Sequence, residues 1–196
     1  MDIVIENLNK KYNNKPILDN LNIKFKENAI SFILGASGIG KTTLIRILMN
    51  LEKADGGNIK GINDKRISAV FQDDCLCENL SVRLNIKLVC ENISDLKIEK
   101  ALEQLDLKGC MNKKVRELSG GMKRRIAILR ALLYDFDLLI MDEPFKGLDK
   151  ETKEKVMNFV ISKVKNKTVI IITHEVCEVE YFRENSMLRI DELFMG

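Results

Sequence analysis

The chain has 196 residues, of which 45% are hydrophobic and 31% charged, so it is long enough for one domain with a sizeable core. Its 32 basic and 29 acidic residues are interspersed and leave a net charge of +3, too weak an imbalance to predict nucleic-acid binding. The five cysteines are odd in number and lack metal-ligand spacing, so we expect reduced thiols. No apolar run approaches the roughly 18 residues that a membrane-spanning helix needs.

The N-terminal part of the chain predicts two antiparallel strands followed by a buried strand and a helix. Residues 3–8 and 21–25 have strand character, and Asn13-Asn14 lies in the turn between them. The apolar run at residues 29–34 predicts a buried strand. Apolar residues then recur at helical spacing over residues 42–49.

The segment between that strand and that helix has the pattern G-x-x-x-x-G-K-[ST], in the form Gly35-Ala36-Ser37-Gly38-Ile39-Gly40-Lys41-Thr42. Its glycines let the backbone wrap a phosphate, so that successive N–H groups and the helix N-terminus point at the oxygens. Lys41 is expected to reach the β- and γ-phosphates and Thr42 to bind Mg²⁺, with Thr43 beside them. An ordinary glycine-rich turn is the alternative, but it does not require a strand and a helix on its two sides. The segment predicts a nucleoside triphosphate site.

The central part of the chain predicts a strand at residues 68–71 and helices at 81–90, 94–105 and 122–133. The segment Leu118-Ser119-Gly120-Gly121-Met122 leads into the last helix, so Ser119 and the glycine N–H groups can form a second phosphate cradle. A flexible Ser-Gly loop is the alternative. The basic cluster Lys123-Arg124-Arg125 predicts a solvated helix face, or help with phosphate charge, rather than DNA binding.

An apolar strand at residues 138–141 ends in Asp142 and Glu143, which Pro144 follows. Its apolar character indicates a parallel strand that is buried on both faces. Neighbouring side chains on a strand diverge, so Asp142 suits the Mg²⁺ shell, while Glu143 would orient or deprotonate the attacking water. A strand end that is acidic without a catalytic role is the alternative. Together with the phosphate loop, the pair favours transfer of phosphate to water, and hence a hydrolase over a kinase.

The rest of the chain predicts a helix at residues 150–165, a strand at 168–173, a short helix at 175–182 and a strand at 187–190. Such alternation of strands and helices predicts a parallel sheet that is covered on both faces. The predicted fold class is therefore α/β, with a mostly parallel core sheet and an N-terminal antiparallel β piece.

With these segments in this order, the chain resembles an ATP-binding cassette (ABC) protein over nearly its whole length. The segment at residues 118–122 is similar to the family signature, although Met122 stands where Gln is usual. In the family this loop belongs to the opposing subunit. The resemblance therefore implies that ATP is sandwiched between the phosphate loop of one chain and Ser119, Gly120 and Gly121 of another.

Four more positions match the family in order. Tyr12 is similar to the aromatic residue that stacks on adenine, and Gln72 to the loop glutamine that contacts Mg²⁺ and the attacking water. Asp149, in Gly147-Leu148-Asp149, resembles the loop by which two subunits touch near the nucleotide. His174, the only histidine, resembles the residue that hydrogen-bonds the γ-phosphate. A single Tyr or His is more often structural, so these roles depend on the resemblance.

The resemblance implies a P-loop NTPase of the ABC type. Residues 1–196 would form one nucleotide-binding domain, with a small helical subdomain inserted at about residues 73–120. The expected activity is ATP hydrolysis with ATP and Mg²⁺, in a dimer of this chain with itself or with a similar subunit. Hydrolysis would drive transport by separate integral-membrane permease subunits, with the chain bound peripherally to the cytoplasmic face of the cell membrane.

Two finer expectations and two alternatives remain. Residues 72–77 and 80–86 are similar to importers of the nitrate, sulfonate and taurine group, and abundant Lys, Asn and Ile are typical of an AT-rich bacterial genome. One alternative is a soluble cassette ATPase in another process, such as iron–sulfur cluster assembly. The other, a P-loop kinase of small molecules, conflicts with the signature loop and with Glu143.

Overall fold

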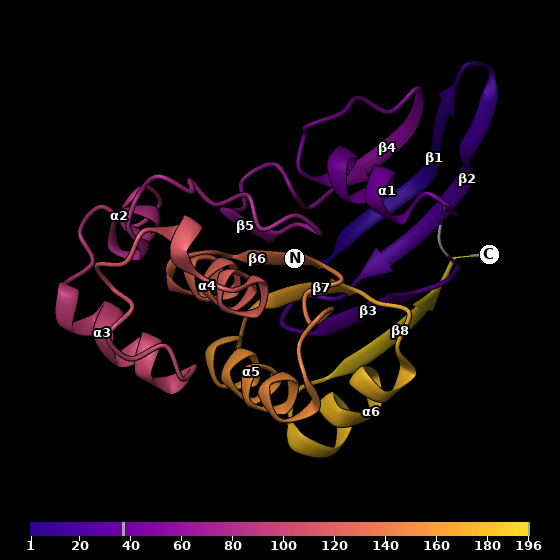
Figure 1. The fold of residues 1–196 in the computed structure, drawn as a ribbon. Helices are drawn as coiled ribbons and strands as arrows, with labels where there is room; N and C mark the ends of the chain where they lie inside the picture. The colour runs from indigo at the N-terminus through magenta and orange to yellow at the C-terminus, as the bar shows by residue number, and fades with distance from the viewer. Residues whose placement is uncertain (37, 196) are drawn as a thin grey trace.

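The computed structural model describes residues 1–36 and 38–195, so Ser37 of the predicted phosphate loop lies outside the described residues. The described chain forms a five-stranded sheet and a three-stranded sheet, with helices packed around them (Figure 1). Within this part of the chain, no helix combines the length and the apolar character that crossing a bilayer requires. The architecture confirms the α/β class that the alternation of elements predicts.

The larger sheet has the strand order β5-β6-β7-β3-β8, and every neighbouring pair is parallel. Its strands are β3 (Ile30–Leu34), β5 (Ile67–Val70), β6 (Leu138–Asp142), β7 (Thr168–Ile172) and β8 (Ile190–Phe194). The three central strands are buried at every position, as expected for apolar runs inside a parallel sheet. Since all five strands run the same way, their carboxyl ends meet at one edge, where the phosphate loop follows β3 and Glu143 follows β6.

The larger sheet is the middle layer of the molecule, and alternate residues of its strands belong to two separate hydrophobic clusters. On one face, Phe32 and Met141 pack with helices α4 (Gly120–Leu133), α5 (Lys150–Lys163) and α6 (Val176–Asn185). On the other face, Ile33 and Ile140 pack with α1 (Lys41–Leu48) and with the smaller sheet. Figure 1 shows α5 and α6 on the side of the larger sheet opposite to α1.

The smaller sheet is antiparallel, with the order β2-β1-β4, and consists of β1 (Ile3–Tyr12), β2 (Lys15–Phe25) and β4 (Gly56–Lys60). It confirms the predicted N-terminal piece, and Asn13 and Asn14 both have positive φ, as a tight hairpin turn demands. The sequence did not predict β4, because this strand begins with two glycines, which are poor strand formers. Gly57 fits this place because, at its φ of +94°, an added Cβ would lie 2.4 Å from the carbonyl oxygen of Asn7 in β1.

Two helices lie between β5 and α4, as predicted: α2 (Val82–Lys87) and α3 (Asp95–Gln104), followed by a 3-10 turn at Val115–Glu117. Ser81 and Ser94 start these helices, since their hydroxyl oxygens accept from the N–H groups of Leu84 and Lys97 at 3.2 and 3.3 Å. In Figure 1 both helices lie on the far side of the molecule from the β1–β2 hairpin. They separate the loop after β5 from the loop before α4 in sequence.

The C-terminal part differs from its prediction in the bounds of one strand. The sequence predicts a strand at residues 187–190, whereas β8 begins at Ile190 and pairs there with Ile30 of β3. The neighbouring strand selects which residues extend, so the tertiary fold overrides local propensity. The N–H group of Met195 donates to the carbonyl oxygen of Leu34 at 3.1 Å, which places the end of β8 beside the start of the phosphate loop.

Candidate functional site

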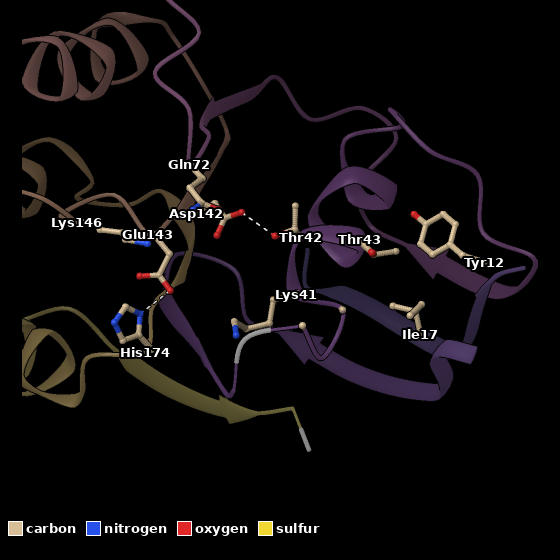
Figure 2. A pocket seen from close by; sticks show the side chains of 12 residues that line it. Tyr12, Ile17, Lys41, Thr42, Thr43, Gln72, Asp142, Glu143, Lys146 and His174 are labelled. Atoms are coloured by element: carbon tan, nitrogen blue, oxygen red, sulfur yellow. Dashed lines mark hydrogen bonds and ion pairs between the residues drawn. The ribbon is translucent and has the colours of Figure 1, made fainter. Parts of the chain in front are cut away.

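A cavity of about 490 Å³ opens at the carboxyl edge of the larger sheet (Figure 2). Each wall comes from a different element: the phosphate loop after β3, Gln72 after β5, Glu143 after β6 and His174 after β7. The β1–β2 hairpin adds Tyr12 and Ile17. The remaining lining residues are Gly38, Gly40, Lys41, Thr42, Thr43, Asp142 and Lys146. Ligands of parallel α/β sheets bind at this edge, so the cavity is the candidate site.

The phosphate loop begins directly after β3 and ends where α1 begins. Gly40 has φ +99°, and a Cβ there would lie 2.8 Å from a methyl carbon of Leu18, so only glycine fits. The Lys41 ammonium donates to the carbonyl oxygens of Gly35 and Ala36, both at 2.7 Å. The loop therefore folds around a buried cation at the N-terminus of a helix, and both features attract an anion.

A hydroxyl and a carboxylate meet on the next side of the cavity. Thr42 Oγ1 donates to Asp142 Oδ2 at 3.1 Å, although the two residues are 100 positions apart. Burial raises the pKa of Asp142, and the hydrogen bond from Thr42 opposes this rise only in part. A cation beside Asp142 would favour its charged form, and Mg²⁺ takes oxygen ligands of this kind. The pair fits a magnesium ion that is also bound to phosphate.

Glu143 and His174 form a second polar pair. His174 Nδ1 lies 2.8 Å from Glu143 Oε1, and both side chains line the cavity (Figure 2). The N–H group of Glu143 still donates to Ile172 of β7 at 2.9 Å, but its φ of +47° is rare outside glycine. Such unusual backbone conformations cluster at functional sites.

Tyr12 and Gln72 are at the two ends of the cavity. Tyr12 is 41% exposed, and its hydroxyl donates to the Glu52 carboxylate, which raises the pKa of Tyr12. The Lys10 ammonium lies 5.5 Å from the centre of the Tyr12 ring. Gln72 follows β5 and is exposed. One broad face of an aromatic ring and one exposed amide therefore remain available to a ligand in this cavity.

The glycines at the start of α4 and the loop before α5 are not part of this cavity. Ser119 starts α4, with its hydroxyl oxygen accepting from Met122 N–H at 3.3 Å. Asp149 starts α5 in the same way, accepting from Thr152 N–H at 3.0 Å, and this contact lowers the pKa of Asp149. A Cβ added at Gly120 would meet nothing within 4 Å. Ser119, Gly120, Gly121 and Asp149 thus lie away from the phosphate loop of their own chain.

The interpretation of the basic cluster as a solvated helix face is wrong for Arg124. Arg124 is only 5% exposed. Its guanidinium binds backbone carbonyl groups at the carboxyl ends of β5 and β6. The helical period contained a signal, because Arg124 shares a face of α4 with the buried residues Ile128 and Ala131. Lys146 was also missed, and its place three residues after Glu143, in the loop that leaves the acidic strand, was the available indication.

Comparison with known proteins agrees with this geometry. Residues 18–146 match the family described as ABC transporter. The spermidine/putrescine import ATP-binding protein PotA of Clostridium novyi (strain NT) is 37% identical, over 88% of this chain and 55% of that protein. The sulfate/thiosulfate import ATP-binding protein CysA of Mesostigma viride is 34% identical, over 89% of this chain and 55% of that protein. The chain thus spans about half the length of these curated relatives.

Solved structures agree in fold. The dimeric structure of MJ0796, a bacterial ABC transporter cassette, is similar with a TM-score of 0.82 and 28% identity, covering 99% of this chain and 95% of that one. The same cassette in a dimeric post-hydrolysis state with ADP and Pi gives a TM-score of 0.80 and 27% identity, over 91% of this chain and 90% of that one. The predicted ABC-type P-loop NTPase fold is confirmed. The chain belongs to the ABC transporter family.

Proposed function

We propose that the chain is the ATP-hydrolysing subunit of an ABC transporter, which closes as a dimer around two Mg·ATP molecules. One observation carries this proposal: a single cavity joins the Lys41 loop, the Thr42–Asp142 pair and the Glu143–His174 pair. These are a phosphate-binding cation, a magnesium-type oxygen pair and a base for water, and all of them line the same cavity. Relatives named as import ATP-binding proteins support the same function.

ATP would lie along the cavity with its phosphates at the helix α1 end. The loop between β3 and α1 would wrap the phosphates, and Lys41 would neutralise the β- and γ-phosphate oxygens. Tyr12, at the opposite end, offers its ring face to the adenine base. Ser37 is included among the proposed phosphate-binding residues because of its place in the loop.

Thr42, Asp142 and Gln72 would supply the oxygen ligands for Mg²⁺. When bound, the ion would neutralise charge on the β- and γ-phosphates. The Thr42 hydroxyl donates to Asp142, which preorganises both oxygens at one place. Gln72 reaches the same cavity from the neighbouring strand β5 and also positions the attacking water.

Glu143 accepts the proton of the attacking water, and His174 orients Glu143 and the γ-phosphate. The 2.8 Å contact between them supports this division of labour, because a base needs a partner that keeps its carboxylate aimed at the water. When His174 donates to Glu143, its Nδ1 atom carries the proton. A base for water, rather than a site for an acceptor alcohol, favours hydrolysis over a kinase reaction.

The second chain would complete each site. Ser119, Gly120 and Gly121 form an exposed helix N-terminus that lies outside the cavity of their own chain, so they suit the phosphates bound by the partner. Asp149 starts the neighbouring helix α5 and would contact the partner near the nucleotide. The dimeric MJ0796 cassettes support this arrangement.

We propose the following organisation around that dimer. Residues 1–196 act as one nucleotide-binding domain, with residues 73–120 as a helical subdomain that meets a permease subunit at the cytoplasmic face of the membrane. Exposed apolar side chains on and beside α2 and α3 support this surface: Leu84, Leu88 and Leu96 are 49%, 59% and 66% exposed. The finer resemblance to nitrate, sulfonate and taurine importers rests on residues 72–86 alone.

Co-purification tests this proposal. The tagged Glu143→Gln chain is expressed in its own cell, membranes are solubilised with MgATP, and bound polypeptides are identified. A stoichiometric polypeptide with several membrane spans is the expected result. A matched control adds Lys41→Ala, which should prevent the ATP-dependent association. Recovery from the cytosol alone, with soluble partners or as a bare homodimer, would favour the soluble cassette ATPase instead.

A further inference from the structure

Arg124, in the first turns of α4, connects the two segments that carry the proposed hydrolytic groups. Its side chain is 6% exposed and belongs to the same helix as the Ser119–Gly121 loop. The five N–H groups of the guanidinium meet six acceptors, with one N–H shared: the carbonyl oxygens of Phe71, Gln72, Asp142, Glu143 and Pro144 and the carboxylate of Asp74. One side chain thus holds the carboxyl ends of both β5 and β6.

The shape of the guanidinium decides how firmly it can hold both ends. The contacts to Phe71 and Glu143 are the shortest, at 2.6 Å, and come from different nitrogen atoms of the fork. Five N–H groups in a fixed plane can satisfy two segments at once, whereas the single ammonium group of lysine cannot span them. Since a buried cation is costly unless its donors are satisfied, the carbonyl groups must stay where Arg124 meets them.

Glu143 is the residue whose backbone most needs such support. Its φ of +47° is unusual, and its carbonyl oxygen and those of both neighbours accept from Arg124. Gln72, on the other segment, accepts through its own carbonyl oxygen at 3.3 Å. Arg124 therefore fixes the backbone, and hence the side-chain direction, of Glu143, the proposed base, and of Gln72, a proposed Mg²⁺ ligand.

The position of Arg124 on α4 links these contacts to the opposite nucleotide. Ser119 starts the helix, Gly120 is its first residue, and Arg124 follows within the first two turns. A helix moves as a stiff rod, so a shift of the Ser119–Gly121 loop displaces Arg124 as well. We propose that Arg124 is a positioning residue that couples phosphate contact at Ser119–Gly121 to the placement of Gln72 and Glu143 in the same chain. This inference rests on the proposed function, because it requires the partner's nucleotide at that loop.

Two variants test the connection. Arg124→Lys keeps the charge but loses the fork, and Arg124→Gln removes the buried charge in case the lysine variant does not fold. The control is Arg66→Lys, because Arg66 joins the opposite ends of the same two strands through Asp137, at 3.0 and 3.1 Å, and lies outside the cavity. The measurements are kcat and KM for MgATP, the Kd for MgADP by calorimetry, and backbone hydrogen exchange.

We expect kcat to fall roughly tenfold or more in both Arg124 variants, since small displacements of reacting groups are costly. The Kd for MgADP should stay within about twofold, because the phosphate loop is untouched. Hydrogen exchange should accelerate at residues 71–74 and at Asp142 and Glu143 but not in α1. The Arg66→Lys control should change none of these. Wild-type kcat, or a loss of MgADP affinity in proportion to kcat, would overturn the positioning role.

A double variant tests the coupling itself. If Arg124 transmits contact at the loop, Ser119→Ala costs less in the Arg124→Lys background than in the wild type, because the connection is already broken. Losses that simply multiply would refute the coupling. A wild-type chain without turnover would instead refute the proposed function. In that case hydrogen exchange, which needs no hydrolysis, still decides whether Arg124 holds the two segments.

Discussion

Two glycine-containing loops in this chain each lead into a helix, yet their surroundings differ. The loop before α1 lies at the carboxyl edge of the larger sheet, where Asp142, Glu143 and His174 converge on it. The loop before α4 is exposed, and a Cβ on Gly120 would touch nothing within 4 Å. Both offer N–H groups to an anion, but in the described part of the chain only the first shares a cavity with a metal-type oxygen pair and a base. Helix geometry makes an anion site, and the neighbouring strands make it a reaction site.

The largest expected effect comes from Glu143, the proposed base beside the loop that precedes α1. Glu143→Gln should lower kcat for ATP hydrolysis by a factor of about 100 or more, because the amide cannot take the proton of water. ATP binding should persist, so light scattering should detect an ATP-bound dimer. Glu151→Gln, an exposed acid in the first turn of α5, is the control. Hydrolysis at the wild-type rate would remove Glu143 from the mechanism.

The next effect separates binding from assembly at the first loop. Lys41→Ala should weaken MgADP binding by a monomer by roughly tenfold or more, since a charge-assisted contact to phosphate is lost. Isothermal calorimetry at low protein concentration measures this affinity. An unchanged affinity would show that the Lys41 ammonium stays with the carbonyl oxygens of Gly35 and Ala36 and does not serve the ligand.

The second loop should respond in the opposite way. Ser119→Ala should leave MgADP binding by a monomer unchanged, yet lower ATPase turnover several-fold, about the effect of one lost hydrogen bond to a charged group. It also removes the cap of α4, which costs about 1 kcal/mol of stability. Ser94→Ala removes an equivalent cap from α3, so it controls for that loss. Equal turnover in the two variants would mean that Ser119 acts only as a cap.

The smallest effect is expected at the edge of the sheet that carries neither loop. Arg66 holds the pKa of Asp137 well below its usual value of 3.8. The contribution of this pair to stability is therefore present above pH 3.8 and is lost as the pH falls toward the lowered pKa. Arg66→Lys should lower the melting temperature by roughly 2 °C or less at pH 7, because the pair is exposed.

Calorimetry across pH checks this last prediction. The difference in melting temperature between wild type and variant should shrink as the pH drops below 3.8, the usual pKa of Asp137. ATPase turnover at pH 7 should be unchanged. A large loss of turnover would mean that the amino-terminal ends of β5 and β6 also control the cavity. The contrast between the two ends of these strands would then be lost.

Much of the site could be predicted because its residues follow strands that are easy to recognise. The apolar runs of β3, with the phosphate loop, and of β6, with Asp142, predict that Asp142 lies close to the phosphate loop. In the structure Thr42 donates to Asp142 at 3.1 Å. Arg124 was misjudged because a basic side chain within a basic cluster is normally solvated. Strand β4 was missed because glycine pairs are poor strand formers, and β8 was displaced because its register depends on β3.

The amino-acid sequence by itself determined the strand–helix alternation, the phosphate loop and the acid pair, because these depend on local periodicity and residue chemistry. Only the tertiary structure decided which carbonyl groups Arg124 binds and where β4 and β8 begin and end. Local patterns specify what each segment can be. Contacts between segments far apart in the chain determine what each buried polar group meets, and that depends on the packing of the whole sheet.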